Sequence, residues 1–251
     1  MLLGHVLRKP RWWILAQGDH RLDRSEYQEF CALISRRAEG EPVAYLRERV
    51  EWADLELKVT PDVLIPRPET ELLVDRAVQL ARRRGATVLA DIGTGSGAIS
   101  IRLARCLPET QVFAVDVSTK ALSVAKTNVQ TYHVEHRVHL LAGHLAEPLF
   151  QTPHLIVANL PYLSDAMMDD LDDDVRHEPR LALHAGTTGL ELYAELFGQL
   201  RGRGRAPALA LEIDSRQGED IGPLIQTYFP AASVDIAKDY AGMDRTVLVS
   251  P

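Results

Sequence analysis

The sequence has few cysteines and no long apolar run. Cys31 and Cys106 are its only cysteines, and they have neither the spacing of a metal site nor the number that a disulfide framework needs. We therefore expect the protein to reside in a reducing compartment, the cytoplasm. No stretch approaches the ~20 consecutive apolar residues that a membrane span requires. Residues 1–5 lack the basic flank and the long apolar core of a signal peptide. These absences predict a cytoplasmic protein without a membrane partner.

The net charge is negative, but the charges are unevenly distributed. A formal charge of -7 argues against direct binding to nucleic acid or to anionic membranes. Residues 1–50 hold nine Lys or Arg against seven Asp or Glu, whereas residues 165–174 contain six aspartates. No His or Glu interleaves these aspartates, so a solvated surface is favoured over a metal site. With 46% hydrophobic and 25% charged residues, the composition is that of an ordinary globular protein, which we expect to be a monomer.

The first 50 residues are predicted to form a small helical N-terminal domain. Asp23 or Ser25 can cap a helix whose apolar residues recur at helical spacing. Too little apolar surface lies here for an independent core, so this region is an appendage. Residues 47–59 change to an apolar period of two, which predicts a β-hairpin. We therefore expect residues 51–251 to form a hairpin linker followed by the main domain.

Strand and helix patterns alternate over the rest of the chain. Residues 64–71 (Leu-Ile-Pro-Arg-Pro-Glu-Thr-Glu) are extended by two prolines, and Pro68 can occupy the first turn of the following helix, which Gly85 ends. Apolar strand patterns then cover residues 87–92, 111–116, 137–142, 154–158, 207–213, 233–237 and 246–250, and the last two are expected to be antiparallel. This alternation predicts an α/β fold, a mostly parallel sheet with helices on both faces, with ligands at the carboxyl ends of the strands.

A glycine-rich loop lies between the first of these strands and the next helix. The loop consists of Gly93, Thr94, Gly95, Ser96 and Gly97. It lacks the G-x-G-x-x-G spacing of a dinucleotide site, so it favours S-adenosylmethionine over NAD. Asp116 ends the next strand, where a carboxylate can accept hydrogen bonds from both hydroxyls of a ribose.

A second motif, Asn159, Leu160, Pro161 and Tyr162, follows the strand at residues 154–158. Pro161 fixes its own φ and holds Leu160 extended, so the Leu160 carbonyl lies at a set angle beside the Asn159 side chain. These two oxygens can accept both hydrogens of a planar –NH2 group, and the Tyr162 ring can stack on it. The alternative is a loop that merely ends a strand.

These motifs together resemble the glutamine N5-methyltransferases that modify peptide chain release factors (the HemK/PrmC type). The resemblance rests on residues 65–71, 91–99, 159–162 and 177–179, and it extends over nearly the whole chain. It implies a seven-stranded methyltransferase sheet and a helical N-terminal domain that grips the release factor. It also implies that the chain methylates the glutamine of the Gly-Gly-Gln loop with S-adenosylmethionine as the methyl donor.

The resemblance assigns roles to particular residues. Cofactor contacts fall on the glycine loop, Asp116 and Asn159, and substrate contacts on the Asn159–Tyr162 quartet. We hypothesise that Trp52 and Tyr162 sandwich the glutamine amide, although Trp52 can equally be a packing anchor between domains. The chain departs from the family pattern at Leu160, where proline is usual, and at the adenine-contact positions His144 and Leu145. It also lacks the sequence signal of the family's first helix.

The sequence leaves two alternative functions open. The quartet Asn-Leu-Pro-Tyr is also typical of RNA adenine N6-methyltransferases, whose target is likewise a planar –NH2. The negative charge, the absence of a basic C-terminal domain and residues 65–71 argue against that activity. His144 and the short N-terminus suggest an inactive binding protein with this fold, whereas the presence of Asp116 and Asn159 argues against it.

Overall fold

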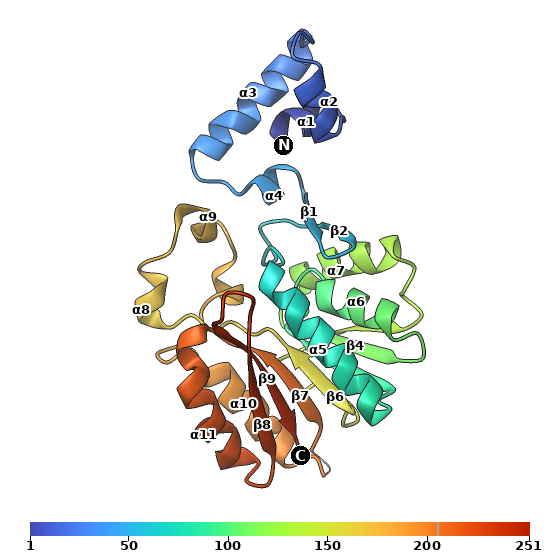
Figure 1. Cartoon of the computed structure of the whole chain (residues 1–251), viewed down its shortest axis with the longest axis vertical. Helices are drawn as coiled ribbons and strands as arrows, with labels where there is room; N and C mark the ends of the chain where they lie inside the picture. Colours follow the sequence, from blue (N-terminus) through green and yellow to red (C-terminus); the bar gives the residue numbers. More distant parts are fainter. Residues whose placement is uncertain (205) are drawn as a thin grey trace.

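The computed structural model describes residues 1–204 and 206–251, and within them a seven-stranded sheet forms the centre of the molecule (Figure 1). The strand order is β5-β4-β3-β6-β7-β9-β8. The strands from β3 to β7 are parallel, and β9 is antiparallel to both of its neighbours. The strands are β3 (Val88–Ile92), β4 (Gln111–Asp116), β5 (Val138–Ala142), β6 (Leu155–Ala158), β7 (Ala208–Glu212), β8 (Ser233–Lys238) and β9 (Asp244–Ser250). The predicted mostly parallel sheet and its antiparallel closing strands are confirmed.

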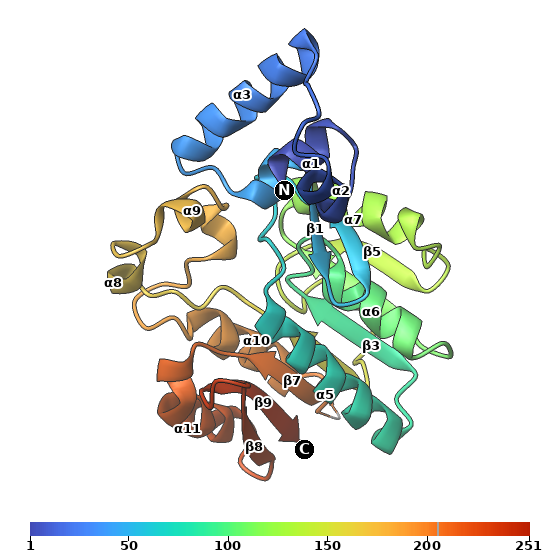
Figure 2. The same ribbon diagram turned by 45° about the horizontal axis from the view of Figure 1, so that its top comes forward.

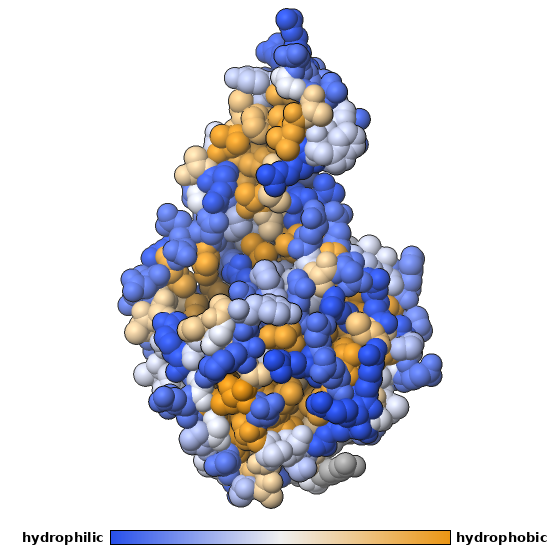
Figure 3. Space-filling view, viewed as in Figure 1, coloured by the Kyte–Doolittle hydropathy of each residue, from blue (hydrophilic) through white to orange (hydrophobic). Residues whose placement is uncertain are grey.

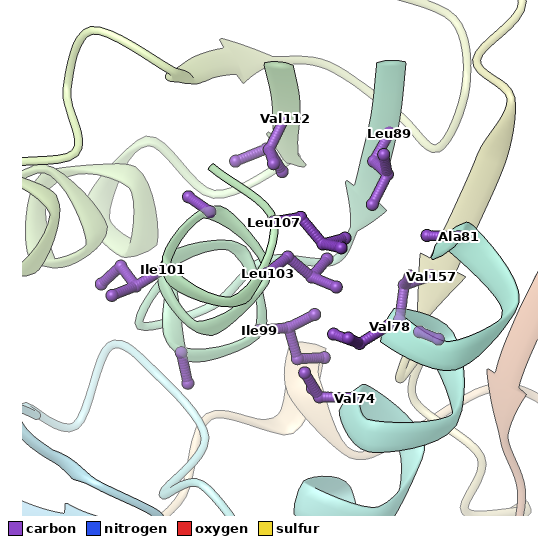
Figure 4. Close-up of a cluster of buried hydrophobic side chains, with 14 of the residues drawn as sticks. Val74, Val78, Ala81, Leu89, Ile99, Ile101, Leu103, Leu107, Val112 and Val157 are labelled. Carbon is purple, nitrogen blue, oxygen red and sulfur yellow. The ribbon is translucent and has the colours of Figure 1, made fainter. Parts of the chain in front are cut away.

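Helices cover both faces of the sheet, and each face has its own apolar core. One core joins the strands to α5 (Pro68–Arg84), α6 (Ala98–Cys106) and α7 (Thr119–Thr131). Figure 4 shows the side chains of α5 and α6 meeting those of β3, β4 and β6 in this core. The other core joins the strands to α10 (Glu191–Arg201) and to α11 (Gly218–Tyr228), which follows the short 3-10 helix η2 (Ser215–Gln217).

Local sequence signals set the ends of several helices. Helix α5 begins at Pro68 and ends before Gly85, which has the left-handed conformation (φ 60°) that a residue without Cβ adopts at low cost. The Ser118 side chain caps α7 by accepting from the backbone N–H of Ala121. Asp23, rather than Ser25, caps α3 in a reciprocal capping box with Glu26.

The N-terminal helices form a lobe that stands above the sheet domain (Figures 1 and 2). The lobe contains α1 (Leu2–Val6), α2 (Arg11–Ala16) and α3 (Arg24–Ala38), and it leads through α4 (Val43–Leu46) to the predicted hairpin, β1 (Arg49–Trp52) and β2 (Leu55–Lys58). Helix α4 is the joint: Leu46 packs with Leu2 and Leu33 of the lobe, while the Tyr45 hydroxyl donates to the carbonyl of Val63, 2.6 Å away.

A segment of 22 residues, 163–184, lies between β6 and α10. It contains the short helices α8 (Asp165–Met168) and α9 (Asp173–Arg176) and the 3-10 helix η1 (Arg180–Ala182). Its Asp174 pairs with Arg37 of α3 at 2.7 Å, so the segment also contacts the N-terminal lobe. Across residues 1–204 and 206–251, the helices are too short or too polar to cross a bilayer.

Candidate functional site

A cavity of about 390 Å³ opens at the carboxyl ends of the parallel strands. Its walls come from parts of the chain that are far apart in sequence, among them the stretch before α5, the loops after β3, β4, β5 and β6, and the η1 region of segment 163–184. The glycine loop (residues 93–97) and the Asn159–Tyr162 motif each follow a strand of the same parallel sheet. The predicted topology therefore requires both to lie at this edge. This cavity is the candidate active site.

The glycine loop forms the floor of the cavity between β3 and α6. Gly93 has φ 77°, and a Cβ there would lie 3.2 Å from a side-chain carbon of Leu160. Gly97 has φ 84° and packs against Ala125 of α7, so it shapes the loop without being among the lining residues, whereas Gly93, Thr94, Gly95 and Ser96 do line the cavity. A larger residue at either glycine would be strained and crowded.

The buried side chain of Asp91 stabilises the glycine loop by hydrogen bonding. No role for Asp91 was predicted from the sequence. One carboxylate oxygen of Asp91 accepts from the Thr94 hydroxyl at 2.6 Å, and from the backbone N–H and hydroxyl of Ser100 at 3.1 and 2.7 Å. Burial raises the pKa of Asp91 to about 6, and these hydrogen bonds partly oppose the shift. A charged residue inside an otherwise apolar strand was the signal that could have singled it out.

Asp116, at the end of β4, lines the cavity beside the glycine loop. Its two oxygens accept from the backbone N–H of Gly95 at 2.9 Å and of Ser118 at 2.8 Å. Burial raises its pKa, and the backbone hydrogen bonds lower it in part. Because each carboxylate oxygen has a second lone pair, Asp116 can bind ribose hydroxyls while it holds the loop.

His144 and Leu145 also line the cavity, after β5. The Nε2 atom of His144 lies 2.8 Å from a carboxylate oxygen of Glu195 on α10, so this nitrogen is occupied by a protein partner. Leu145 has φ 51°, and its side chain is buried in the core beneath α10. The family resemblance predicts that both residues lie near the cofactor, whereas the contact between His144 and Glu195 was not predicted from the sequence.

Asn159, Leu160 and Pro161, in the loop after β6, also line the cavity. The Asn159 Nδ2 donates to the Thr70 hydroxyl in the first turn of α5 at 3.1 Å. The backbone N–H of Leu160 lies 3.4 Å from the hydroxyl of Tyr193. With these donor groups engaged by the protein, the Asn159 Oδ1 and the Leu160 carbonyl are the acceptors of this corner.

The two aromatic residues expected at the substrate, Trp52 and Tyr162, do not line the cavity in this structure. Trp52 is 2% exposed, packs in the core of the α5 face, and donates from Nε1 to the carbonyl of Arg67 at 2.7 Å. The Tyr162 carbonyl accepts from Gln217 at 3.2 Å, and burial raises the pKa of its phenol to about 12. Neither ring is among the cavity-lining residues that the structure describes, so Trp52 is the packing anchor of the hairpin and the expected sandwich is absent from this conformation.

Residues 65–71 and 177–179, two further stretches that carry the family resemblance, are joined by one ion pair. Arg67, from the stretch before α5, pairs with the buried carboxylate of Glu178, which also accepts from the backbone N–H of Ile65 at 3.1 Å. Arg67 and Pro66 line the cavity on one side of this contact and Pro179 on the other. Spacing in the sequence did not predict this pairing.

The residues present fit an adenosyl group with an attached amino acid. Such a ligand is matched by a cradle of positive-φ glycines, by a carboxylate at the end of the next strand and by a largely apolar remainder of the cavity. The described residues hold no cluster of three or more metal-ligating side chains. The strand order with an antiparallel β9 and the position of this cavity define a methyltransferase fold.

Comparisons with known proteins identify the family. Residues 1–47 match the PrmC N-terminal domain, and residues 69–183 match the ribosomal protein L11 methyltransferase (PrmA) family. The chain is 40% identical over 253 residues to the release factor glutamine methyltransferase of Moorella thermoacetica, covering 99% of this chain and 88% of that protein. It is 35% identical to that of Bacillus anthracis, covering 98% and 89%. The chain belongs to the release factor glutamine methyltransferase family.

Solved structures show the same fold at low sequence identity. The hMettl16 catalytic domain in complex with MAT2A 3'UTR hairpin 6 aligns with a TM-score of 0.61 and 14% identity, covering 92% of this chain and 93% of that one. The ribosomal protein L11 methylase of Lactobacillus delbrueckii subsp. bulgaricus aligns with a TM-score of 0.56 and 20% identity, covering 77% and 84%. Family membership therefore confirms the predicted enzyme class and favours it over the RNA-modifying and inactive alternatives.

Proposed function

We propose that this chain transfers a methyl group to the side-chain amide nitrogen of the glutamine in the Gly-Gly-Gln loop of a peptide chain release factor, and that Asn159 and Leu160 hold that amide. The observation that carries the proposal is the orientation of Asn159. Its Nδ2 donates to Thr70, which leaves its Oδ1 as an acceptor beside the Leu160 carbonyl at the cavity wall.

The cofactor in this proposal is S-adenosylmethionine, which supplies an electrophilic methyl group when it is bound. The glycine loop and Asp116 would hold it, with His144 and Leu145 at its edge. The backbone N–H of Gly95 is already fixed by Asp116, so part of this site is organised before any ligand enters. Such preorganisation lowers the entropic cost of binding.

An amide nitrogen is a poor nucleophile because its lone pair is delocalised into the carbonyl group. Two acceptors at Asn159 and Leu160 would take both amide hydrogens and orient the nitrogen toward the methyl group. Positive charge that develops on the nitrogen would then lie beside oxygens that need no reorganisation. No general base is needed, because the cationic product loses its proton readily to water.

The N-terminal lobe is the proposed docking element for the release factor. It exposes the large side chains of Trp12, Leu15, Tyr27 and Ile34. Figure 3 shows an orange, hydrophobic area on the upper part of the molecule. Exposed apolar groups of this kind mark interaction surfaces. Remote contacts would supply the binding energy that orients the amide, so free glutamine should be a poor substrate.

The experiment is a methyl-transfer assay with labelled S-adenosylmethionine and two substrates, a purified release factor and ribosomal RNA. Mass spectrometry of the digested factor should place one methyl group on the Gly-Gly-Gln glutamine. A release factor in which that glutamine is alanine is the matched control and should remain unlabelled. Label on adenine in RNA, with none on the glutamine, would contradict the proposal and favour the RNA-modifying alternative.

A further inference from the structure

Glu212 is a buried carboxyl group that the proposed reaction does not use. It is the last residue of β7 and is 1% exposed. Ala158 of β6 is paired with Leu211 of β7, so Asn159 and Glu212 are the next residues along two adjacent parallel strands. Their side chains therefore emerge at the same level of the sheet.

Both side chains also point to the same face. Side chains alternate along a strand, and the residues two positions before Asn159 and Glu212, Val157 and Ala210, belong to the core of the α5 face. Helix α5 begins above this point and supplies Thr70 from its first turn. The Asn159 amide, the Thr70 hydroxyl and the Glu212 carboxyl thus converge, with Asn159 and Thr70 lining the cavity and Glu212 outside the set of lining residues.

The contacts inside this cluster are directional. The Asn159 Nδ2 donates to the Thr70 hydroxyl at 3.1 Å, so the hydroxyl hydrogen of Thr70 is available for another acceptor. The polar side chains of Thr70 and Asn159 and the charge of Arg245 lower the pKa of Glu212 and so favour its ionised form. The Tyr193 hydroxyl donates to the Glu212 carbonyl and lies 3.4 Å from the Ala158 carbonyl, which ties the ends of the two strands together.

A carboxyl group in this position is costly for stability. Burial opposes its ionisation, and among the described residues its Oε2 has no hydrogen-bond partner. An apolar or amide side chain would avoid the cost of placing a charge in the core. Ionisable groups held at such a cost concentrate at functional sites.

We propose that Glu212 is a positioning residue that fixes the Asn159 amide with its oxygen toward the cavity. This inference rests on the proposed role of Asn159. An ionised carboxylate only accepts hydrogen bonds, so it can bind the –NH2 end of the asparagine and excludes the flipped orientation. Its negative charge, on the far side of the amide, also polarises Asn159 so that Oδ1 becomes a stronger acceptor for the substrate's N–H.

The kinetic test replaces Glu212 with glutamine, which keeps the size and removes the obligatory acceptor. We expect the Glu212→Gln variant to lose about tenfold in kcat, less than the ~10²–10³ that removal of a direct contact costs, with KM for the release factor nearly unchanged. Glu212→Asp keeps the charge and should recover part of the rate. Glu219→Gln, at an exposed glutamate of α11, is the matched control and should leave both constants unchanged.

A spectroscopic test needs no substrate or cofactor. The chain contains two asparagines, Asn128 and Asn159, so selective ¹⁵N-asparagine labelling yields two side-chain amide signals. Asn128 donates to the backbone carbonyls of Lys58 and Ser96 and serves as the internal reference. At pH 8.5 we expect Glu212→Gln to shift the Asn159 side-chain amide signal and to speed its hydrogen exchange, while the Asn128 signal stays in place.

The outcomes separate this inference from the proposed function. Unchanged kcat together with an unchanged Asn159 signal in Glu212→Gln would overturn the role of Glu212. If the wild-type chain methylates no release factor, the proposed function fails, whereas the amide signals still decide whether Glu212 holds Asn159. If Glu212→Gln does not fold, Thr70→Val is the second variant, since it removes the hydroxyl that accepts from the Asn159 Nδ2. It should shift the Asn159 side-chain amide signal, and an unshifted signal would refute the cluster.

Discussion

Arg67 and Glu178 form an ion pair between two cavity walls that are 111 residues apart in the sequence. The Glu178 side chain is 1% exposed and that of Arg67 is 32% exposed. Burial raises the pKa of Glu178, and the Arg67 guanidinium opposes that shift. The pair therefore holds segment 163–184 against the stretch that precedes α5 and keeps the shape of the cavity between them.

Arg67→Ala should destabilise the fold because it leaves the Glu178 carboxylate buried without its partner. The loss should be smaller than the roughly 3–5 kcal/mol typical of fully buried pairs, since Arg67 is partly exposed. Urea unfolding measures this loss of stability. Arg36→Ala breaks an exposed pair with Glu41 and is the control, with an expected change below about 1 kcal/mol. Equal losses in both variants would contradict a structural role for the Arg67–Glu178 pair.

Asn159→Ala should lower kcat by ~10²–10³ and leave cofactor affinity nearly unchanged, because one preorganised acceptor of the substrate amide is lost. Single-turnover methylation measures the rate, and calorimetry measures cofactor binding. Gln151→Ala, on an exposed loop, should behave as the wild type. Weakened cofactor binding, with an unchanged methylation rate at saturating cofactor, would assign Asn159 to the cofactor instead of the substrate.

Asp116→Ala should weaken cofactor binding. Hydrogen bonds to a charged group contribute roughly 1.5–3 kcal/mol, which corresponds to a 10- to 150-fold rise in Kd. The loss of the bond from Gly95 should also loosen the glycine loop. Calorimetry with S-adenosylmethionine measures the change, and Asp235→Ala on the exposed side of β8 is the control. Equal Kd values in the wild type and Asp116→Ala would remove Asp116 from the site.

Glu212 should make stability depend on pH in a defined direction. Its pKa is raised to about 7: burial is the main cause and the charge of Glu69 contributes, while Thr70 and Arg245 oppose the shift. Between roughly pH 4.3, the usual glutamate pKa, and pH 7, the folded chain keeps a proton that the unfolded chain releases. The contribution of Glu212 to stability is therefore lost as pH rises through this window, by up to about 1.4 kcal/mol per pH unit.

The comparison of wild type with Glu212→Gln isolates this effect. Relative to the wild type, the variant should gain stability between pH 5 and pH 8, as measured by urea unfolding at both values. The Tyr162 and Tyr193 phenols near Glu212 stay neutral in this range, since burial raises the pKa of Tyr162 to about 12 and raises that of Tyr193 further. A constant stability difference between the two proteins across this range would show that Glu212 does not titrate there.

Much of the fold could be predicted from short-range patterns. The strand and helix boundaries follow apolar periodicity, and the ends of helices follow residues such as Pro68, Gly85 and Ser118, whose effects are local. The order of β and α units then requires the glycine loop and the Asn159 motif to share one sheet edge, and both line the same cavity. These features depend on the backbone, which local sequence largely determines.

The side-chain partners were decided only by the tertiary structure. Whether Trp52 reaches a substrate or packs in the core depends on how the hairpin docks on the sheet domain, and the packing buries its indole. The pairing of Arg67 with Glu178, and the convergence of Thr70 and Glu212 on Asn159, join residues from separate elements. Periodicity specifies which face of an element is buried, but a side-chain partner that is distant in the sequence is set by packing and by the need to satisfy each buried polar group.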